Sequence, residues 1–202
     1  MNDDGRAGLP EGGDREGAGA PEDAGRRELV KWLWRAPVLA ALGGGAYGLY
    51  RAVDVHFLKR RPDPTPEFDD APPTTVAPLD AFAAPWDAVD FMLAATPAVA
   101  MRVPAPVPGG LTAGEAHLVA FSRVCTHQMC LATLNTDVNA INFGFNYDTR
   151  TPAITCPCHL SVFDPLRAGQ AVSGPAVLPL PRARLELRDG EVVATGWERA
   201  QG

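Results

Sequence analysis

The chain has 202 residues, a net charge of −6 and 46% hydrophobic residues, which suits one domain with appended segments. Nothing in this acidic composition resembles the basic patch of a nucleic-acid binder, so we expect no nucleic-acid partner. Twenty prolines and twenty glycines predict extensive loops and extended linkers, and the four cysteines do not make a small disulfide scaffold.

Residues 1–25 are rich in glycine, proline, alanine and acidic residues. They contain almost no large apolar side chains, so they cannot bury enough surface to offset the cost of ordering. We expect a disordered N-terminal tail.

Residues 26–53 contain a short apolar run that predicts one N-terminal transmembrane helix. The uncharged part, Ala36–Tyr50, has 15 residues. As a helix it would measure about 22 Å, against a bilayer core of about 30 Å. Flanking arginines and interfacial aromatic residues would have to complete the span. The alternative is a buried helix of a soluble domain.

Arg26 and Arg27 open the motif RRELVK ahead of this weakly hydrophobic segment. The motif resembles a twin-arginine export signal, which implies export of an already folded protein. No convincing cleavage site follows, so we expect an uncleaved single-pass anchor in the cell membrane, with the domain on the extracytoplasmic side. The alternative is a chance arginine pair at a membrane edge.

Residues 54–79 are expected to form a hinge. Six prolines and several acids fall within residues 62–79. Such a sequence cannot form a helix or a central strand, and it predicts an extended, semi-rigid tether.

Residues 80–202 are typical of a mainly β domain. Asp189-Gly190, between two apolar runs, is the strongest hairpin signal in the chain. Residues 86–95 favour a short helix. Further strands are expected at residues 99–103, 117–121, 154–155, 185–187 and 192–195.

Two short motifs contain all the cysteines and half of the histidines: 125-CTHQMC-130 and 156-CPCHLS-161. Cysteine and histidine at such spacing indicate a metal site first. A structural zinc ion takes four ligands, two fewer than the six available here. Two plain disulfides would suit an exported protein but leave the histidines unexplained. An iron–sulfur cluster with one disulfide uses all six residues.

The two motifs resemble the paired signature of the Rieske iron–sulfur family, C-x-H-x-G-C followed by C-x-C-H-x-S. The resemblance implies an antiparallel β-sandwich with a small cluster-binding subdomain, here with loops at about residues 123–181. It implies one [2Fe–2S] cluster, a disulfide between Cys130 and Cys158, and four ligands. The implied ligands are Cys125 and Cys156 on one iron and His127 and His159 on the other. Neutral imidazoles make such a cluster less negative, which raises its reduction potential above that of all-cysteine ferredoxins.

The anchor, tether, β domain and 173-SGPAVLPLP-181 together resemble the iron–sulfur subunit of quinol:cytochrome c oxidoreductases. That resemblance implies a proton-translocating membrane complex with cytochrome b and c-type cytochrome subunits. Quinol would hydrogen-bond His127 or His159 and give up an electron and a proton. The head would then swing on its tether to the cytochrome.

The resemblance also predicts residues that tune and shield the cluster. Ser161 matches a serine that hydrogen-bonds a cluster sulfide, whereas Phe163 replaces a tyrosine that donates to a ligand sulfur. Loss of that donor predicts a lower potential, suited to menaquinol. Met129 and Leu160 stand where the family has glycine, which favours differently shaped loop tips. The residues expected to shield or dock the cluster are Gln128, Met129, Leu160, Gly174 and Pro175.

Other functions are weighed against this one. The Rieske small subunit of an arsenite oxidase is the nearest alternative, and the long tether favours the quinol-oxidising reading over it. A Rieske oxygenase would need a second iron site, for which this chain lacks room and histidines. A zinc-stabilised cell-surface binding module is the alternative from a different class.

Overall fold

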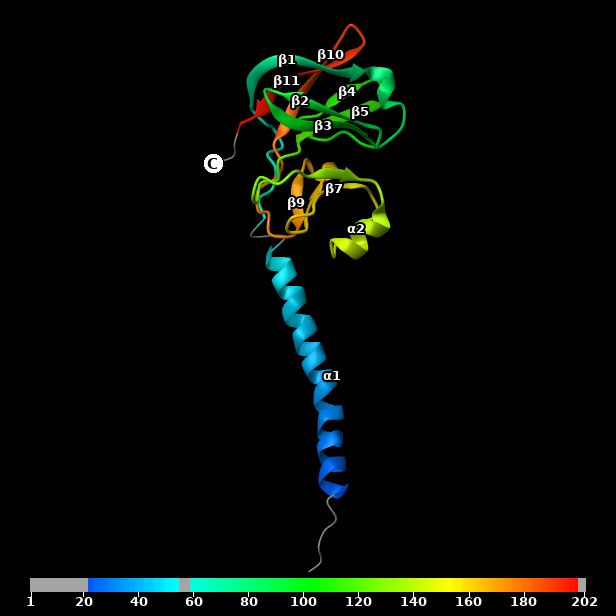
Figure 1. The fold of residues 1–202 in the computed structure, drawn as a ribbon, viewed down its shortest axis with the longest axis vertical. Helices are drawn as coiled ribbons and strands as arrows, with labels where there is room; N and C mark the ends of the chain where they lie inside the picture. The colour runs from blue at the N-terminus through cyan, green and yellow to red at the C-terminus, as the bar shows by residue number, and fades with distance from the viewer. Residues whose placement is uncertain (1–21, 55–58, 200–202) are drawn as a thin grey trace, which may run out of the picture. The chain divides into compact units, whose positions relative to one another are not determined.

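The computed structural model describes residues 22–54 and 59–199, which divide after Leu49 into two compact parts. The helix α1 (Glu22–Val53) begins in the first part, and the second part contains two antiparallel β-sheets (Figure 1). The prediction of a mainly β, antiparallel fold is confirmed, and the strands form two antiparallel sheets.

The helix α1 differs from its prediction in two ways. Residues 22–25, assigned to the disordered tail, form its first turn, and residues 1–21 lie outside the described part. Within the described residues, no helix is both long enough and apolar enough to cross a membrane, so the predicted transmembrane span is not supported. The apolar run of α1 is short, is interrupted by Gly43–Gly45, and is flanked by charged residues.

The larger sheet has seven strands in the order β1-β11-β10-β5-β3-β2, with β4 paired to β5. Asp189 and Gly190 link β10 to β11 with φ angles of 51° and 84°, the left-handed pair that a tight hairpin requires. The strand bounds are β1 (Phe68–Pro78), β2 (Ala88–Leu93), β3 (Thr96–Val103), β4 (Leu111–Ala113), β5 (Ala116–Ser122), β10 (Arg182–Arg188) and β11 (Glu191–Glu198).

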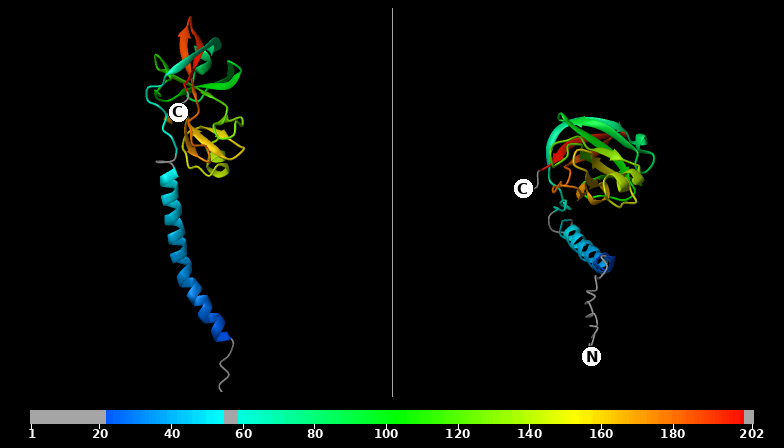
Figure 2. Two further views of the ribbon diagram at one scale, coloured as in Figure 1. Left: turned by 90° about the vertical axis from the view of Figure 1, so that its left-hand side faces the viewer. Right: turned by 60° about the horizontal axis from the view of Figure 1, so that its bottom comes forward.

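The smaller sheet has four strands in the order β6-β7-β8-β9. Its yellow to orange segments lie together in both views of Figure 2. Its strands are β6 (Thr133–Asn135), β7 (Ala153–Cys156), β8 (Ser161–Asp164) and β9 (Gln170–Ser173). The helix α2 (Val138–Gly144) follows β6, and two short 3-10 helices, η2 (Leu79–Phe82) and η3 (Pro165–Arg167), complete the domain.

Both sheets are buried on two faces, and successive residues of a strand enter different cores. In β3, Val99 and Met101 join the core shared by the two sheets, whereas Ala100 joins the core enclosed by the larger sheet alone. In β7, Ile154 and Cys156 face the shared core, and Ala153 packs with Ile141 of α2. Because side chains alternate along a strand, this pattern fixes the register of both sheets.

The short helix predicted at residues 86–95 is wrong. Residues 88–93 form β2, which pairs with β3. Its Val89 and Phe91 pack at a spacing of two against the core of the larger sheet, together with Leu93. Burial on one face at that spacing requires a strand.

The prediction of a free tether over residues 54–79 is wrong for its C-terminal part. Residues 68–78 form β1 and pair with β11 at the edge of the larger sheet. Pro72 and Pro73, which lack an N–H, fall where the register shifts between Asp70 and Thr74. An edge strand with an irregularity accommodates prolines that a central strand would not.

A buried ion pair ties the preceding segment to the domain. Arg182 is fully buried, and its guanidinium bonds both carboxylate oxygens of Glu198 at 2.9 and 2.7 Å. It also donates to the carbonyls of Pro108 and Asp63 at 2.7 and 2.8 Å. Residue 63 therefore lies against the domain and not in a free linker.

We expect the substitution Glu198→Gln to destabilise the domain by about 3–5 kcal/mol, because it leaves a buried guanidinium without a counter-charge. The control is Glu67→Gln, which breaks an exposed ion pair with Arg199 and should cost about 1 kcal/mol or less. Urea unfolding measures both; equal costs would contradict the prediction.

Candidate metal centre

The first cysteine–histidine loop (residues 124–131) is closed at its base by an isolated bridge between Val124 and Leu131. The Cys125 N–H donates to the Cys130 carbonyl at 2.8 Å, and the Met129 N–H donates to the Cys125 carbonyl at 3.0 Å. Cys125 is thus buried at the base of the loop, whereas Gln128 and Met129 are exposed at its tip.

The second cysteine–histidine loop (residues 157–160) is the turn between β7 and β8. Cys156 ends β7 and pairs with Ser161, the first residue of β8. Both are buried, and His159 and Leu160 in the turn between them are exposed. Each loop therefore has a buried thiol at its base and a histidine further along the turn.

Met129 and Leu160 adopt φ angles of 59° and 58°. These left-handed values are the ones that glycine adopts most readily. The two side chains, which are 75% and 47% exposed, point out to solvent and do not prevent the conformation. Both positions thus adopt a glycine-like backbone conformation without glycine.

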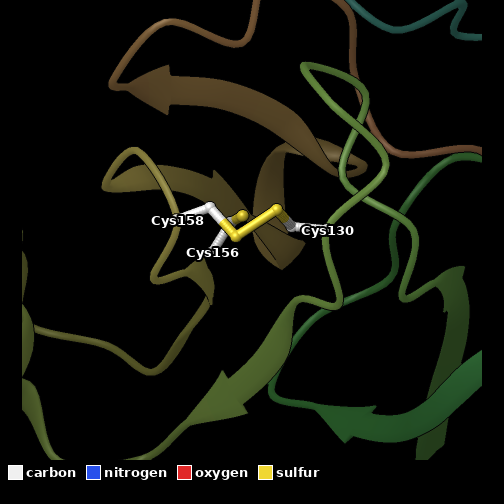
Figure 3. Close-up of side chains that lie close together, drawn as sticks. All are labelled: Cys130, Cys156 and Cys158. Carbon is white, nitrogen blue, oxygen red and sulfur yellow. A yellow bond between two sulfur atoms is a disulfide. The ribbon is translucent and has the colours of Figure 1, made fainter.

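A disulfide joins the two loops. Cys130 and Cys158 are bonded, with their Cα atoms 6.6 Å apart (Figure 3). The sulfur of Cys156 lies within 4.8 Å of both. Because the bonded pair has no thiol left to offer, Cys125 and Cys156 are the two free thiols, and the alternative of two plain disulfides is wrong.

The two free thiols are buried beside one another in the core shared by the sheets. Burial raises the pKa of the Cys156 thiol; backbone N–H groups of Cys158 and His159 oppose the shift, and a hydrogen bond to Cys125 adds to it. Such thiols stay protonated unless a metal binds them, because a metal binds cysteine as the thiolate and supplies the positive charge that offsets burial. This is the environment of a metal-bound pair.

The two motif histidines lie edge to face, with ring centroids 4.9 Å apart. Nδ1 of His127 is buried and has no hydrogen-bond partner among the described residues. A buried polar atom without a partner is costly unless a ligand satisfies it. Together with two free thiols, these rings form a donor set of two sulfurs and two nitrogens that fits a Rieske cluster.

The proline loop (residues 174–181), between β9 and β10, packs on both cysteine–histidine loops. The Thr126 hydroxyl donates to the Leu178 carbonyl at 2.7 Å, and the Ala176 N–H donates to the Ser161 hydroxyl at 3.2 Å. Gly174 has a φ of 75°, and a Cβ there would lie 2.5 Å from the Cα of Ser161. Glycine is therefore required for this close approach.

The fold and this site define a Rieske domain. Residues 96–184 match the family described as the Rieske [2Fe-2S] domain, so this part of the chain is a Rieske domain and its cofactor is a Rieske [2Fe–2S] cluster. That match excludes the zinc-site reading.

The chain is similar to the cytochrome bc1 complex Rieske iron-sulfur subunit of Corynebacterium diphtheriae, with 37% identity over 91 residues. It is also similar to the subunit of that name from Streptomyces lividans, with 33% identity over 93 residues. The matches cover 40% and 41% of this chain, and only 20% and 48% of those proteins.

One similar solved structure is the soluble domain of the Rieske protein II from Sulfolobus acidocaldarius. It is 22% identical with a TM-score of 0.49, and the match covers 65% of this chain and 82% of that one.

The remaining predicted site residues fall into two environments. Phe163 is fully buried in the core that contains Cys125 and Cys156, and Ser161 is buried beneath the proline loop. Pro175 is exposed, as is Gln128. The side chains of Arg26 and Arg27 lie outside the described part, although both residues belong to α1.

Sequence reasoning missed Lys59. This buried lysine bonds two carbonyls of the proline loop. No spacing or motif links residue 59 to residue 174, so no signal in the sequence pointed to it.

We expect the double substitution Cys130→Ser with Cys158→Ser to lower the free energy of unfolding by about 3–4 kcal/mol, because the bridge closes a loop of 28 residues. Denaturant unfolding of the full chain measures this effect. Wild type in strong reductant should show a similar loss, and stability unchanged in both would contradict the prediction.

Proposed function

We propose that this chain is the Rieske electron-transfer subunit of a quinol:cytochrome c oxidoreductase. In it, Cys125 and Cys156 would ligate one iron, and His127 and His159 the other. The observation that carries the assignment is the pair of free buried thiols beside two orthogonal imidazoles, one of which has an unsatisfied buried nitrogen. The similarity to bc1 complex subunits supports the choice of complex.

The surface around the histidines suits docking to a quinol site. His159 is exposed and His127 is half-buried, so a substrate hydroxyl can reach the imidazole edges. The two cysteine–histidine loops and the proline loop also expose apolar side chains: Met129, Leu160, Val177 and Leu178. Exposed apolar side chains on the loops that contain the two histidines favour a partner that presents a membrane-soluble substrate.

The histidine rings would then perform two tasks. A ring nitrogen not used for iron accepts a hydrogen bond from the quinol hydroxyl and afterwards holds the proton. The cluster, when bound, accepts one electron. We further propose menaquinol as the donor, cytochrome b and a c-type cytochrome as partner subunits, and the extracytoplasmic face of the cell membrane as the location, reached through the twin-arginine motif Arg26-Arg27.

We propose that the head still swings, on a tether shorter than residues 54–79. Residues 68–78 belong to the larger sheet, so the full length 54–79 is not available as a tether. Tether length therefore does not distinguish the subunit of a quinol-oxidising complex from the small subunit of an arsenite oxidase. Purification of the native complex separates them: a co-purifying cytochrome b supports the proposal, and a molybdenum subunit overturns it.

The ligand assignment is tested by single substitutions. Cys125→Ser and His127→Gln should each abolish the visible absorption and the paramagnetic resonance of the dithionite-reduced protein, because each removes a ligand. His117→Gln is the matched control, since its imidazole lies on β5 and contacts Thr112. Iron and sulfide analysis should report cluster loss in the first two variants alone.

Phe163→Tyr tests the tuning of the cluster. Phe163 is fully buried in the same core as the two free thiols, and we propose that an added hydroxyl there donates to a sulfur and stabilises the more negative reduced cluster. We expect protein-film voltammetry to show a higher potential in the variant. An equal or lower potential with an intact cluster would contradict the tuning role.

A further inference from the structure

Lys59 is an almost completely buried cation at the entrance to the domain. Its residue exposure is 3%, and Nζ donates to the carbonyls of Gly174 and Ala176, each at 2.7 Å. The next residue adds a backbone bond, from the Arg60 N–H to the Val177 carbonyl at 3.0 Å. Residues 59–60 are therefore attached to the proline loop and not to the nearest strand in sequence.

The same part of the proline loop packs directly on the second cysteine–histidine loop. Gly174 lies against the backbone of Leu160 and Ser161, and the Ala176 N–H bonds the Ser161 hydroxyl. Each carbonyl that accepts from Lys59 thus belongs to a residue in contact with Ser161. Ser161 follows His159 by two residues and pairs with Cys156. Lys59 therefore bonds a loop that itself contacts the segment between the proposed ligands His159 and Cys156 and the strand β8.

A buried lysine is costly unless its donors are used. Burial lowers the pKa of Lys59, an effect that Asp54, 3.8 Å away, opposes. The chain has two lysines and sixteen arginines, and Lys31, the other lysine, is exposed. A compact ammonium at the end of a flexible stem can bond two converging carbonyls, whereas a planar guanidinium is bulkier.

We propose that Lys59 is a positioning residue for the cluster: it fastens the part of the proline loop that packs on the second cysteine–histidine loop to the chain that enters the domain. The inference rests on the proposed ligand set and not on quinol as the substrate. Its positive charge also favours the reduced, more negative cluster. Any pivot of the head then lies before residue 59.

The two lysines allow a direct measurement on the wild-type full chain. Acetylation by an amine-reactive reagent, followed by peptide mass spectrometry, compares their rates in one sample. The two charge-assisted hydrogen bonds predict a reaction at Lys59 that is about ten- to a hundredfold slower than at Lys31. Equal rates at the two lysines would overturn the proposal.

Substitution tests the consequence for the loop. In Lys59→Met, amide hydrogen exchange across residues 174–178 should be about tenfold faster, and the reduction potential should be lower. Lys59→Arg should restore most of the potential because it keeps the charge. Lys31→Met is the control and should change neither quantity.

The outcomes separate this inference from the function proposed above. Unchanged exchange in Lys59→Met overturns the positioning role even if the protein oxidises quinol. Faster exchange in that variant supports the role even if the native complex proves to be of another kind. If Lys59→Met does not fold, the acetylation rates of the wild-type protein still decide.

Discussion

The structure depends on one constraint: two loops from different parts of the chain must place a buried thiol each in the same core. Strand alternation satisfies it. Cys156 faces the shared core because it ends β7 on the same face as Ile154, and Cys125 joins that core from the first loop. Sheet register therefore sets where the two free thiols lie, and the bridge between Cys130 and Cys158 holds the outer parts of the loops together.

Above this core, the site is held by hydrogen bonds to main-chain groups. Thr126, Ser161 and Lys59 come from three separate segments, and each bonds the backbone of the proline loop. Backbone partners place few demands on the side chains of that loop. Val177 and Leu178 consequently remain exposed on that loop.

The sequence correctly predicted those elements that interactions between neighbouring residues determine. The hairpin at Asp189-Gly190 follows from two residues that tolerate a left-handed backbone, and the strand at residues 117–121 follows from a continuous apolar run. The Cys130–Cys158 bridge came from family resemblance, because spacing alone does not determine which cysteines pair.

The predictions that were wrong failed because contacts between distant residues decide the structure there. A proline-rich segment becomes strand β1 because β11 offers an edge, and residues 88–93 become a strand because β3 pairs with them. The burial of Lys59 depends on carbonyls more than a hundred residues away in sequence. In α1 the cause is local, because its apolar run is too short for any helix of the described residues to qualify as a membrane span.

The pairing of β1 with β11 joins the first strand of the domain to the last, Phe68 opposite Glu198. During synthesis the ribosome releases β11 after every other strand, so the edge of the larger sheet remains open until translation of the domain is complete. Contacts this distant in sequence also slow folding. A chain that stops short of β11 leaves β1 and the buried Arg182 without their partners.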